Sequence, residues 1–206
     1  MSSPPSTTAT DAQALLARMR QRTQTAPRHL VEPGPDAVQR RQLLDAAASA
    51  PDHGRILPWR LVLVERPARA RLAEAFEQAL LERVEAAEAS ERERAREKAS
   101  HGPFLALAVV RDGGDGHEHI PHAERLVSLG CALQNLLLMA HAQGFGAGLV
   151  SGPAMQSRAL RDCFGLDARE HAVCFVAVGT VARPREPRER PDPAHLITFL
   201  DPLPAG

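Results

Sequence analysis

The chain has 206 residues, with 25 basic residues balanced by 25 acidic ones and an aromatic fraction of only 3%. This length suits one globular domain with a substantial core, and the balanced charge argues against a general attraction to nucleic acid or to an acidic membrane surface. No apolar run approaches the roughly 18 residues of a membrane span, and so few aromatic rings argue against base stacking.

The N-terminal ten residues are rich in Ser, Thr and Pro. They lack the charged and apolar regions of a signal peptide, so we expect a disordered leader over 1–10 and a single domain over 11–206. Cys131, Cys163 and Cys174 are odd in number and lie in apolar runs. Such cysteines are typical of small core residues in a reducing compartment, which predicts a cytoplasmic protein.

The first part of the domain predicts two helices and a strand. A helix is expected over 11–22, followed by a proline-punctuated loop over 23–35. Asp36 begins a capping-box pattern, which predicts a second helix over 37–48. The apolar run at 60–64 is typical of a buried strand.

Residues 69–100 predict one long helix or two. Over the first half an apolar side chain recurs every four residues, at Leu72, Phe76, Leu80 and Val84. The second half, 85–98, is nearly all Ala, Glu and Arg. It predicts a solvated face or a mobile flap, because it has no large apolar residues to bury.

The second half of the chain predicts three further strands, at 104–110, 145–151 and 172–178. Two helices are expected between them, at 121–143 and 153–164. The helix at 121–143 is apolar on most of its circumference, so it must be central or pack against a partner chain.

After the last of these strands, residues 184–193 carry several prolines and predict an extended surface segment. This segment leads to an apolar patch at 196–200 that needs a groove to dock in. The strands and helices of the whole chain do not alternate as regular βαβ units. We therefore predict an α+β sandwich in which helices cover a mixed sheet.

A glycine-rich run, Gly-Phe-Gly-Ala-Gly, occupies 144–148. A dinucleotide-binding fold needs a strand before such glycines and a helix after them, whereas here the predicted helix comes first. Two interpretations remain: a tight helix-to-strand turn, or a place where the backbone approaches a ligand closely.

Histidines gather in the loop after the second strand, at His117, His119 and His122, near Asp115 and Glu118. Their spacing matches no helical metal-binding pair, so a hydrophilic surface loop is favoured over a metal site. Ser151 does not lie in a nucleophile elbow. No residue pattern in the chain predicts a catalytic dyad.

Three ordered blocks carry a family resemblance. Residues 28–59 include Glu-Pro-Gly-Pro, then Ala-Pro-Asp-His and Pro-Trp after the second predicted helix. The second block, 130–152, runs through Ala-Gln-Gly-Phe-Gly and ends in Ser-Gly. The third contains Val-Gly-Thr at 178–180 and Arg-Pro-Asp-Pro at 190–193. Together these blocks resemble the short, minimal branch of the nitroreductase family, over most of the chain.

The resemblance implies a nitroreductase-like α+β sandwich, with a mainly antiparallel sheet, that binds FMN at a homodimer interface. NADH or NADPH would reduce the FMN, and a nitroaromatic or quinone would reoxidise it in a ping-pong scheme. The chemistry would rest on the flavin. The resemblance places FMN contacts at Arg20, Arg22, Thr23, Ser49, His53, Leu149, Val150 and Ser151. It places the nicotinamide nucleotide at Met139, Ala140, His141, Ala142, Gln143 and Gly144.

The chain departs from the family pattern at three of these places. The Arg-Arg-Ser motif of the family reads Gln-Arg-Thr at 21–23, Ser49 stands where an arginine is frequent, and Trp-Arg-Ser reads Leu-Val-Ser at 149–151. These departures favour an alternative function, a noncatalytic flavin-binding protein of the same fold. A metal-dependent hydrolase using the loop histidines is a third, more distant interpretation.

Overall fold

The computed structural model describes residues 9–184, 186 and 188–200. The chain forms two compact units: residues 24–184, and a second unit made from the two ends of the chain, 1–23 and 185–206. The predicted leader lies outside the described residues except for its last two positions. There the first helix, α1 (Ala9–Gln21), has already begun, so the helix starts two residues earlier than predicted.

The larger unit is built on an antiparallel sheet. Its longest strand, β5 (Glu170–Val181), pairs with β3 (Phe104–Arg111), which in turn pairs with β2 (Trp59–Leu63). β5 also pairs with β4 (Gly146–Val150) and with the two-residue strand β1 (Leu30–Val31). Each strand predicted from the sequence is present, but β1 is an addition because its residues were predicted to lie in a loop.

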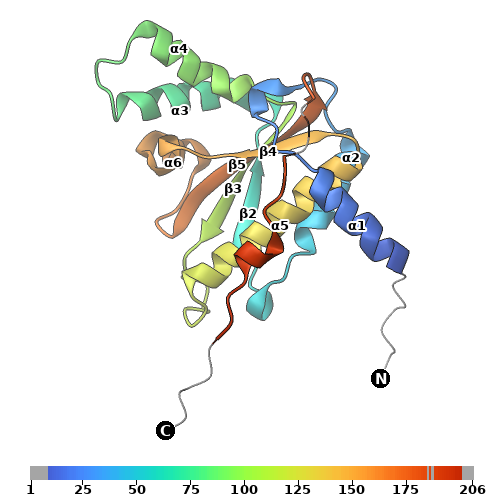
Figure 1. Cartoon of the computed structure of the whole chain (residues 1–206). Helices are drawn as coiled ribbons and strands as arrows, with labels where there is room; N and C mark the ends of the chain where they lie inside the picture. Colours follow the sequence, from blue (N-terminus) through green and yellow to red (C-terminus); the bar gives the residue numbers. More distant parts are fainter. Residues whose placement is uncertain (1–8, 185, 187, 201–206) are drawn as a thin grey trace. The chain divides into compact units, whose positions relative to one another are not determined.

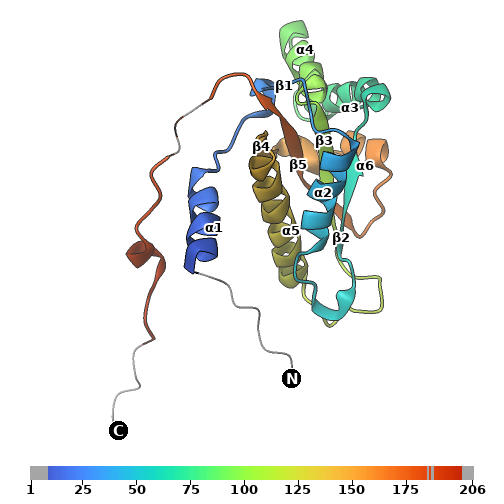
Figure 2. The ribbon, with the colours of Figure 1, turned by 90° about the vertical axis from the view of Figure 1, so that its right-hand side faces the viewer.

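Alternating side chains of the buried strand β3 face two separate hydrophobic cores. The even-numbered residues 104–110 face one core, together with α2 (Ala37–Ala48) and α5 (His122–Ala142). The odd-numbered residues 105–109 face the other core, with α3 (Arg69–Leu81) and α6 (Arg158–Phe164). Helices therefore cover both faces of the sheet, which confirms the predicted sandwich; α2 lies against α5 in both ribbon views (Figures 1 and 2).

The capping box predicted for α2 is present. The side chain of Asp36 accepts a hydrogen bond of 2.8 Å from the Gln39 amide, and the Gln39 side chain accepts one from the Asp36 amide. These two bonds satisfy backbone donors at the start of the helix. The helix ends at Ala48, as predicted from the Pro51 that follows.

The charged segment 85–98 folds as a separate helix, α4 (Ala89–Glu97), which lies along α3 (Figure 1). Glu77 of α3 is only 8% exposed and accepts hydrogen bonds from Arg92 and Arg96 of α4. Ala95 and Ala99 are buried on the same side. The segment is therefore more than a solvated surface, because one of its faces is fastened to the body of the unit.

The smaller unit contains α1 and a 3-10 helix, Pro193–Leu196, near the other end of the chain. Apolar side chains of α1 and of residues 196–200 are exposed, from Leu15 in α1 to Phe199, which is 88% exposed. Among the described residues, none of 197–200 forms a strand. None of the helices in the described part of the chain is long and apolar enough to cross a membrane.

Candidate functional site

The larger unit contains a cavity of about 560 Å³, a volume in the range of small-molecule sites. Its floor is apolar and includes Phe76, Leu105 and Phe175. These three residues belong to the core on the α3 and α6 side of the sheet. The walls come from the segment 26–28, from α4 and from residues 150–155, which follow directly from β4.

One face of α4 lines this cavity. The lining residues are Glu91, Arg94 and Ala95 of the helix and Lys98 directly after it, which follow the spacing i, i+3, i+4 and i+7 of a single helix face. The other two arginines of the helix, Arg92 and Arg96, point to Glu77 instead. Two arginines of the helix therefore attach it to α3, while its third arginine lines the cavity.

The charge around the cavity is strongly unbalanced. Four permanent cations line it, and Glu91 is the one carboxylate among the lining residues; the cations are Arg28, Arg83, Arg94 and Lys98. His101 also lines the cavity, and burial lowers its pKa; the charge of Glu97 opposes this shift, and the charges of Arg28 and Lys98 add to it. His101 is therefore predominantly neutral at pH 7.

The end of β4 brings two predicted flavin residues into the cavity wall. Val150 and Ser151 both line it. The Ser151 hydroxyl donates a hydrogen bond of 3.0 Å to the carbonyl oxygen of Val173, so its oxygen remains able to accept one from a ligand. Leu149 does not line the cavity; it packs against the core on the opposite face.

The glycines of β4 are explained by a close backbone crossing. Gln24 forms a parallel bridge with Ala147, and its side-chain amide donates a hydrogen bond of 2.6 Å to the Leu149 carbonyl oxygen. A Cβ on Gly148 would overlap the carbonyl oxygen of Thr25. At Gly146, a Cβ would overlap the Val181 side chain. At these two positions the glycines are required by chain packing, which is neither of the two interpretations of the glycine run, whereas Gly144, with a φ of 84°, fits the predicted turn.

Arg22, in the smaller unit, has two buried guanidinium nitrogens that lack a partner in the part of the chain that the structure describes. Its Nε and Nη1 are shielded from solvent and have no hydrogen-bond partner among the described residues. Arg190 donates a hydrogen bond of 2.6 Å to the Arg22 carbonyl oxygen. Burial, followed by the charge of Arg190, lowers the pKa of Arg22. Two cations held together with unused donors are typical of an anion site.

Arg20 and Thr23 flank this arginine in the chain. Arg20 is exposed, and its carbonyl oxygen accepts a longer hydrogen bond of 3.4 Å from Arg190. Thr23 is half-buried and immediately precedes Gln24, which borders β4. The predicted phosphate segment is therefore continuous with the backbone that crosses the strand.

Ser49 and His53 lie on the sheet face opposite the cavity. Ser49 ends α2, and its hydroxyl donates a hydrogen bond of 2.9 Å to the carbonyl oxygen of Asp45. The Nδ1 atom of His53 lies 2.7 Å from Oε2 of Glu124 in α5. Both helices cover the other core. Within one chain, the structure therefore does not bring Ser49 and His53 together with Val150 and Ser151.

The predicted nucleotide segment, Met139 to Gly144, forms the end of α5 and the turn after it. Ala140 is fully buried in the core, so its side chain cannot contact a ligand. The Gln143 amide donates to the Gln39 carbonyl oxygen and to the Gln42 side chain of α2. Gly144 has a φ of 84°, which suits the turn at a helix end. Met139 and His141 are half-buried and Ala142 is exposed.

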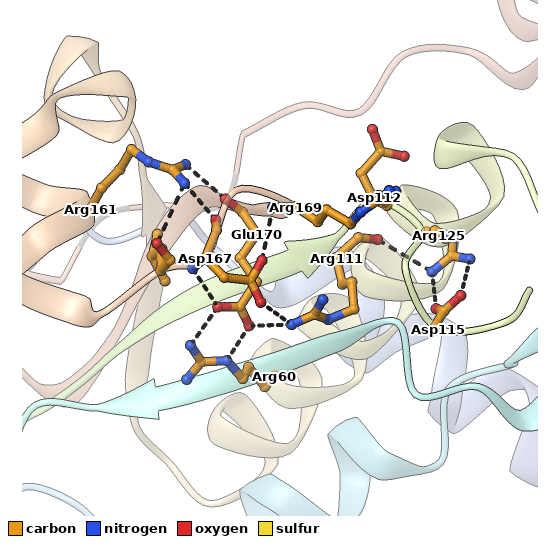
Figure 3. Close-up of polar contacts among 10 residues, drawn as sticks. Arg60, Arg111, Asp112, Asp115, Arg125, Arg161, Asp167, Arg169 and Glu170 are labelled. Atoms are coloured by element: carbon orange, nitrogen blue, oxygen red, sulfur yellow. Dashed lines mark hydrogen bonds and ion pairs between the residues drawn. The ribbon is translucent and has the colours of Figure 1, made fainter. Parts of the chain in front are cut away.

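The histidine loop is organised around an arginine (Figure 3). Arg125 is buried and forms an ion pair with Asp115, and it also donates a hydrogen bond to the His117 carbonyl oxygen. Within the described residues, no group of three His, Cys, Asp or Glu side chains is arranged to hold a metal ion. Nearby, Arg60 of β2 makes a two-bond ion pair with Glu170 of β5, which joins strands on either side of β3.

Sequence reasoning missed the cationic residues of the cavity. Arg28 comes from a different segment from Arg94 and Lys98, and only the fold places the three cations around one volume. Arg190 could have been found, because it opens the Arg-Pro-Asp-Pro block that carries part of the family resemblance. The spacing of Glu91, Arg94 and Lys98 was also visible, but a charged helix face alone usually indicates solvent.

Comparisons with known proteins agree with this architecture. A family model described as "Nitroreductase family" matches residues 20–180. The Escherichia coli K12 protein named "Putative NAD(P)H nitroreductase YdjA" is 31% identical over 175 residues, covering 83% of this chain and 92% of the relative.

Solved structures show the same fold. A nitroreductase-like family protein from Bacillus cereus superposes with a TM-score of 0.75 at 16% identity, covering 98% of this chain and 100% of that one. A structure titled "putative nitroreductase in complex with fmn" from Desulfovibrio desulfuricans has a TM-score of 0.67 at 21% identity, with coverage of 98% and 100%.

Proposed function

The chain belongs to the nitroreductase family, and from that premise we propose that it is an FMN-dependent oxidoreductase that draws electrons from NAD(P)H. The observation that carries the proposal is the cavity at the end of β4, lined by Ser151 of the predicted flavin segment. FMN, when bound, would supply hydride transfer, and the protein would supply binding, orientation and electrostatics.

The residues of this chain fit the requirements of FMN. Its phosphate needs charged donors, and Arg22 offers two guanidinium nitrogens without partners among the described residues. Arg190, which is bonded to the Arg22 backbone, is a second cation for the same phosphate. We assign Arg22, Thr23 and Arg190 to the phosphate, with Arg20 beside them.

The flavin ring needs an apolar floor and a few polar groups at its edge. The cavity offers Phe76, Leu105 and Phe175 as the floor, and Ser151 as a hydrogen-bond acceptor. Arg28 would stabilise the negative charge that a reduced flavin carries at its pyrimidine end. The Glu124 carboxylate orients the His53 ring through a hydrogen bond. We assign to His53 the role of holding the cofactor in place, and not that of an obligatory proton donor.

A homodimer would complete the site. Ser49 and His53 lie on the opposite sheet face from the cavity, so we infer that they contact the flavin bound by a second subunit. The exposed apolar side chains of α1 and of residues 196–200 favour the same interpretation, since large exposed apolar patches mark interaction surfaces. We also propose a cytoplasmic location, from the three free cysteines.

The nucleotide is assigned to the end of α5, where His141 and Ala142 are more accessible than the buried Ala140. A single cavity of this size can hold the nicotinamide or a small acceptor over the flavin, but not both. NAD(P)H should therefore leave before a nitroaromatic or quinone enters. Initial rates at several acceptor concentrations should give parallel double-reciprocal lines, and intersecting lines would contradict this scheme.

The departures from the family motif at residues 21–23 and 149–151 favour one second candidate, a flavin-binding protein without turnover. The two candidates differ in one measurable property. Both predict a yellow protein, but only the reductase predicts that NADH or NADPH removes the colour under anaerobic conditions.

A further inference from the structure

The four cations around the cavity exceed what an oxidised flavin ring needs. Arg28, Arg94 and Lys98 have no ion pair within the described part of the chain. Arg83 donates a hydrogen bond to the Ala79 carbonyl oxygen, which leaves its charge uncompensated. Glu91 can offset only one of the four charges. Unpaired cations grouped over an apolar floor favour a ligand that is both flat and negatively charged.

Two of the cations, Arg94 of α4 and Lys98 directly after it, are the ones least explained by cofactor binding. Arg94 and Lys98 lie one helical turn apart on the face that lines the cavity. The helix itself is held on α3 by the ion pairs of Glu77 with Arg92 and Arg96. Anchoring of this kind keeps the two free cations in position over the cavity, although their own side chains are exposed.

We propose that Arg94 and Lys98 select an anionic aromatic electron acceptor, such as a carboxylate-bearing nitroaromatic, by pairing with its charged group while its ring lies over the flavin that covers the apolar floor. This inference rests on the proposed function, because it names the acceptor class of the same site. The reaction balances as one nitro compound, one NAD(P)H and one proton giving one nitroso compound, one NAD(P)⁺ and one water, with two electrons transferred.

The pKa of His101, in the wall of the same cavity, should respond to a bound anionic acceptor. His101 lies beside Arg28 and Lys98, and the charges of both cations contribute to its lowered pKa. An anion bound among the same cations would raise that pKa, because opposite charge favours the protonated imidazole. His101 therefore reports on anion binding without any turnover.

The test compares 4-nitrobenzoate with 4-nitrobenzamide, which has nearly the same shape but no charge. The holoenzyme, the variants Arg94→Gln and Lys98→Gln, and the double variant are each assayed with both acceptors. The control is Arg158→Gln, which removes one exposed cation outside the cavity. For each variant, kcat/KM for 4-nitrobenzoate is divided by kcat/KM for 4-nitrobenzamide. Comparing this ratio between variants cancels the different intrinsic reactivities of the two acceptors.

We expect each cavity substitution to lower kcat/KM for 4-nitrobenzoate about three- to tenfold, with the 4-nitrobenzamide value and the control unchanged. An unchanged ratio in the double variant would overturn the inference. So would a loss confined to FMN affinity or to the KM for NADPH, since the cations would then serve a cofactor phosphate.

A second measurement tests anion binding at Arg94 and Lys98 independently of the proposed reductase activity. The pKa of His101 is measured by NMR with and without benzoate, which is not reduced. Benzoate should raise this pKa in the wild-type protein and not in the double variant, whether or not the flavin turns over. Equal behaviour of the two proteins would contradict anion binding at Arg94 and Lys98. Absence of flavin reduction with a normal benzoate response would instead contradict only the proposed function.

Discussion

The backbone amide of Thr25 donates a hydrogen bond of 3.0 Å to the carbonyl oxygen of Ala147. This bond and the Gln24–Leu149 hydrogen bond attach the segment after the first helix to β4. The same segment follows directly from Arg22 and Thr23, which we assign to the FMN phosphate. Within the larger unit, the close approach of Gln24 and Thr25 to β4 therefore depends on the glycines of that strand.

Replacing Gly148 with Ala should weaken FMN binding, because it would displace the strand that leads to Val150 and Ser151, which line the cavity. The added Cβ would overlap the Thr25 carbonyl oxygen, so the segment must move away from β4. We expect a loss of stability of about 1–3 kcal/mol, typical of overpacking, together with a higher Kd for FMN. The control is Gly130→Ala, because a Cβ there meets no atom within 4 Å. Equal FMN affinity in both variants would contradict this account of β4.

Arg22→Ala should weaken FMN binding by about 1.5–3 kcal/mol, the range for hydrogen bonds to charged groups. The matched control is Arg66→Ala, since Arg66 is an exposed arginine that pairs with Glu32 on the larger unit. Fluorescence titration of the apoprotein with FMN measures both. Equal losses of FMN affinity in the two variants would show that other residues bind the phosphate, with Arg20 as the next candidate.

Much of the larger unit could be predicted from local sequence patterns. The capping box at Asp36, the continuous apolar run of β3 and the apolar helix α5 each carry their own signal. β1 was missed because it has only two residues, which lie among prolines, and forms through pairing with β5. α4 was predicted as a solvated or mobile segment because its attachment depends on Glu77, which lies outside the charged run.

The candidate site could be predicted only in part. Ser151 was found through the family motif, and the cavity includes it. The cations at Arg28 and Arg94 come from segments whose proximity depends on tertiary packing, so no local pattern reveals them. Leu149 was also assigned to the flavin, yet its side chain packs in the opposite core, because successive residues of a strand face opposite sides.

Acidification should release α4 before the rest of the larger unit. The hydrogen bonds from Arg96 and Arg92 hold the pKa of Glu77 below its usual value of 4.5. A carboxyl group with a lowered folded-state pKa stabilises the fold above its unfolded-state pKa, and this contribution is lost as pH falls through the folded-state value. We expect hydrogen exchange of α4 amides, corrected for intrinsic rates, to accelerate below about pH 4.5.

The control for this acid effect is a substitution at the anchor itself. Glu77→Gln should make α4 exchange quickly at neutral pH and abolish the acid-induced step. Glu74→Gln, one turn earlier on α3 and exposed, should behave like the wild type. A step that persists in Glu77→Gln would assign the pH dependence to another group.

Light scattering of the FMN-bound protein should give the mass of a dimer. Phe199 and Leu200 are almost fully exposed in the single chain, and burying apolar side chains of this size favours association. The double substitution Phe199→Ser with Leu200→Ser should therefore shift the protein toward monomer. Val84→Ser, which removes a less exposed apolar side chain between α3 and α4, is the control. A wild-type monomer that holds FMN would contradict the two-subunit site.

The visible absorption spectrum of the purified protein, reconstituted with FMN and titrated anaerobically with NADH and then NADPH, tests the central proposal most directly. We expect a flavin spectrum that bleaches, with one equivalent of nucleotide consumed per FMN, because hydride transfer delivers two electrons. A protein that retains no FMN would contradict the assignment of the cavity and of Arg22. A yellow protein that neither nucleotide bleaches would contradict the reductase and identify a noncatalytic flavin-binding protein.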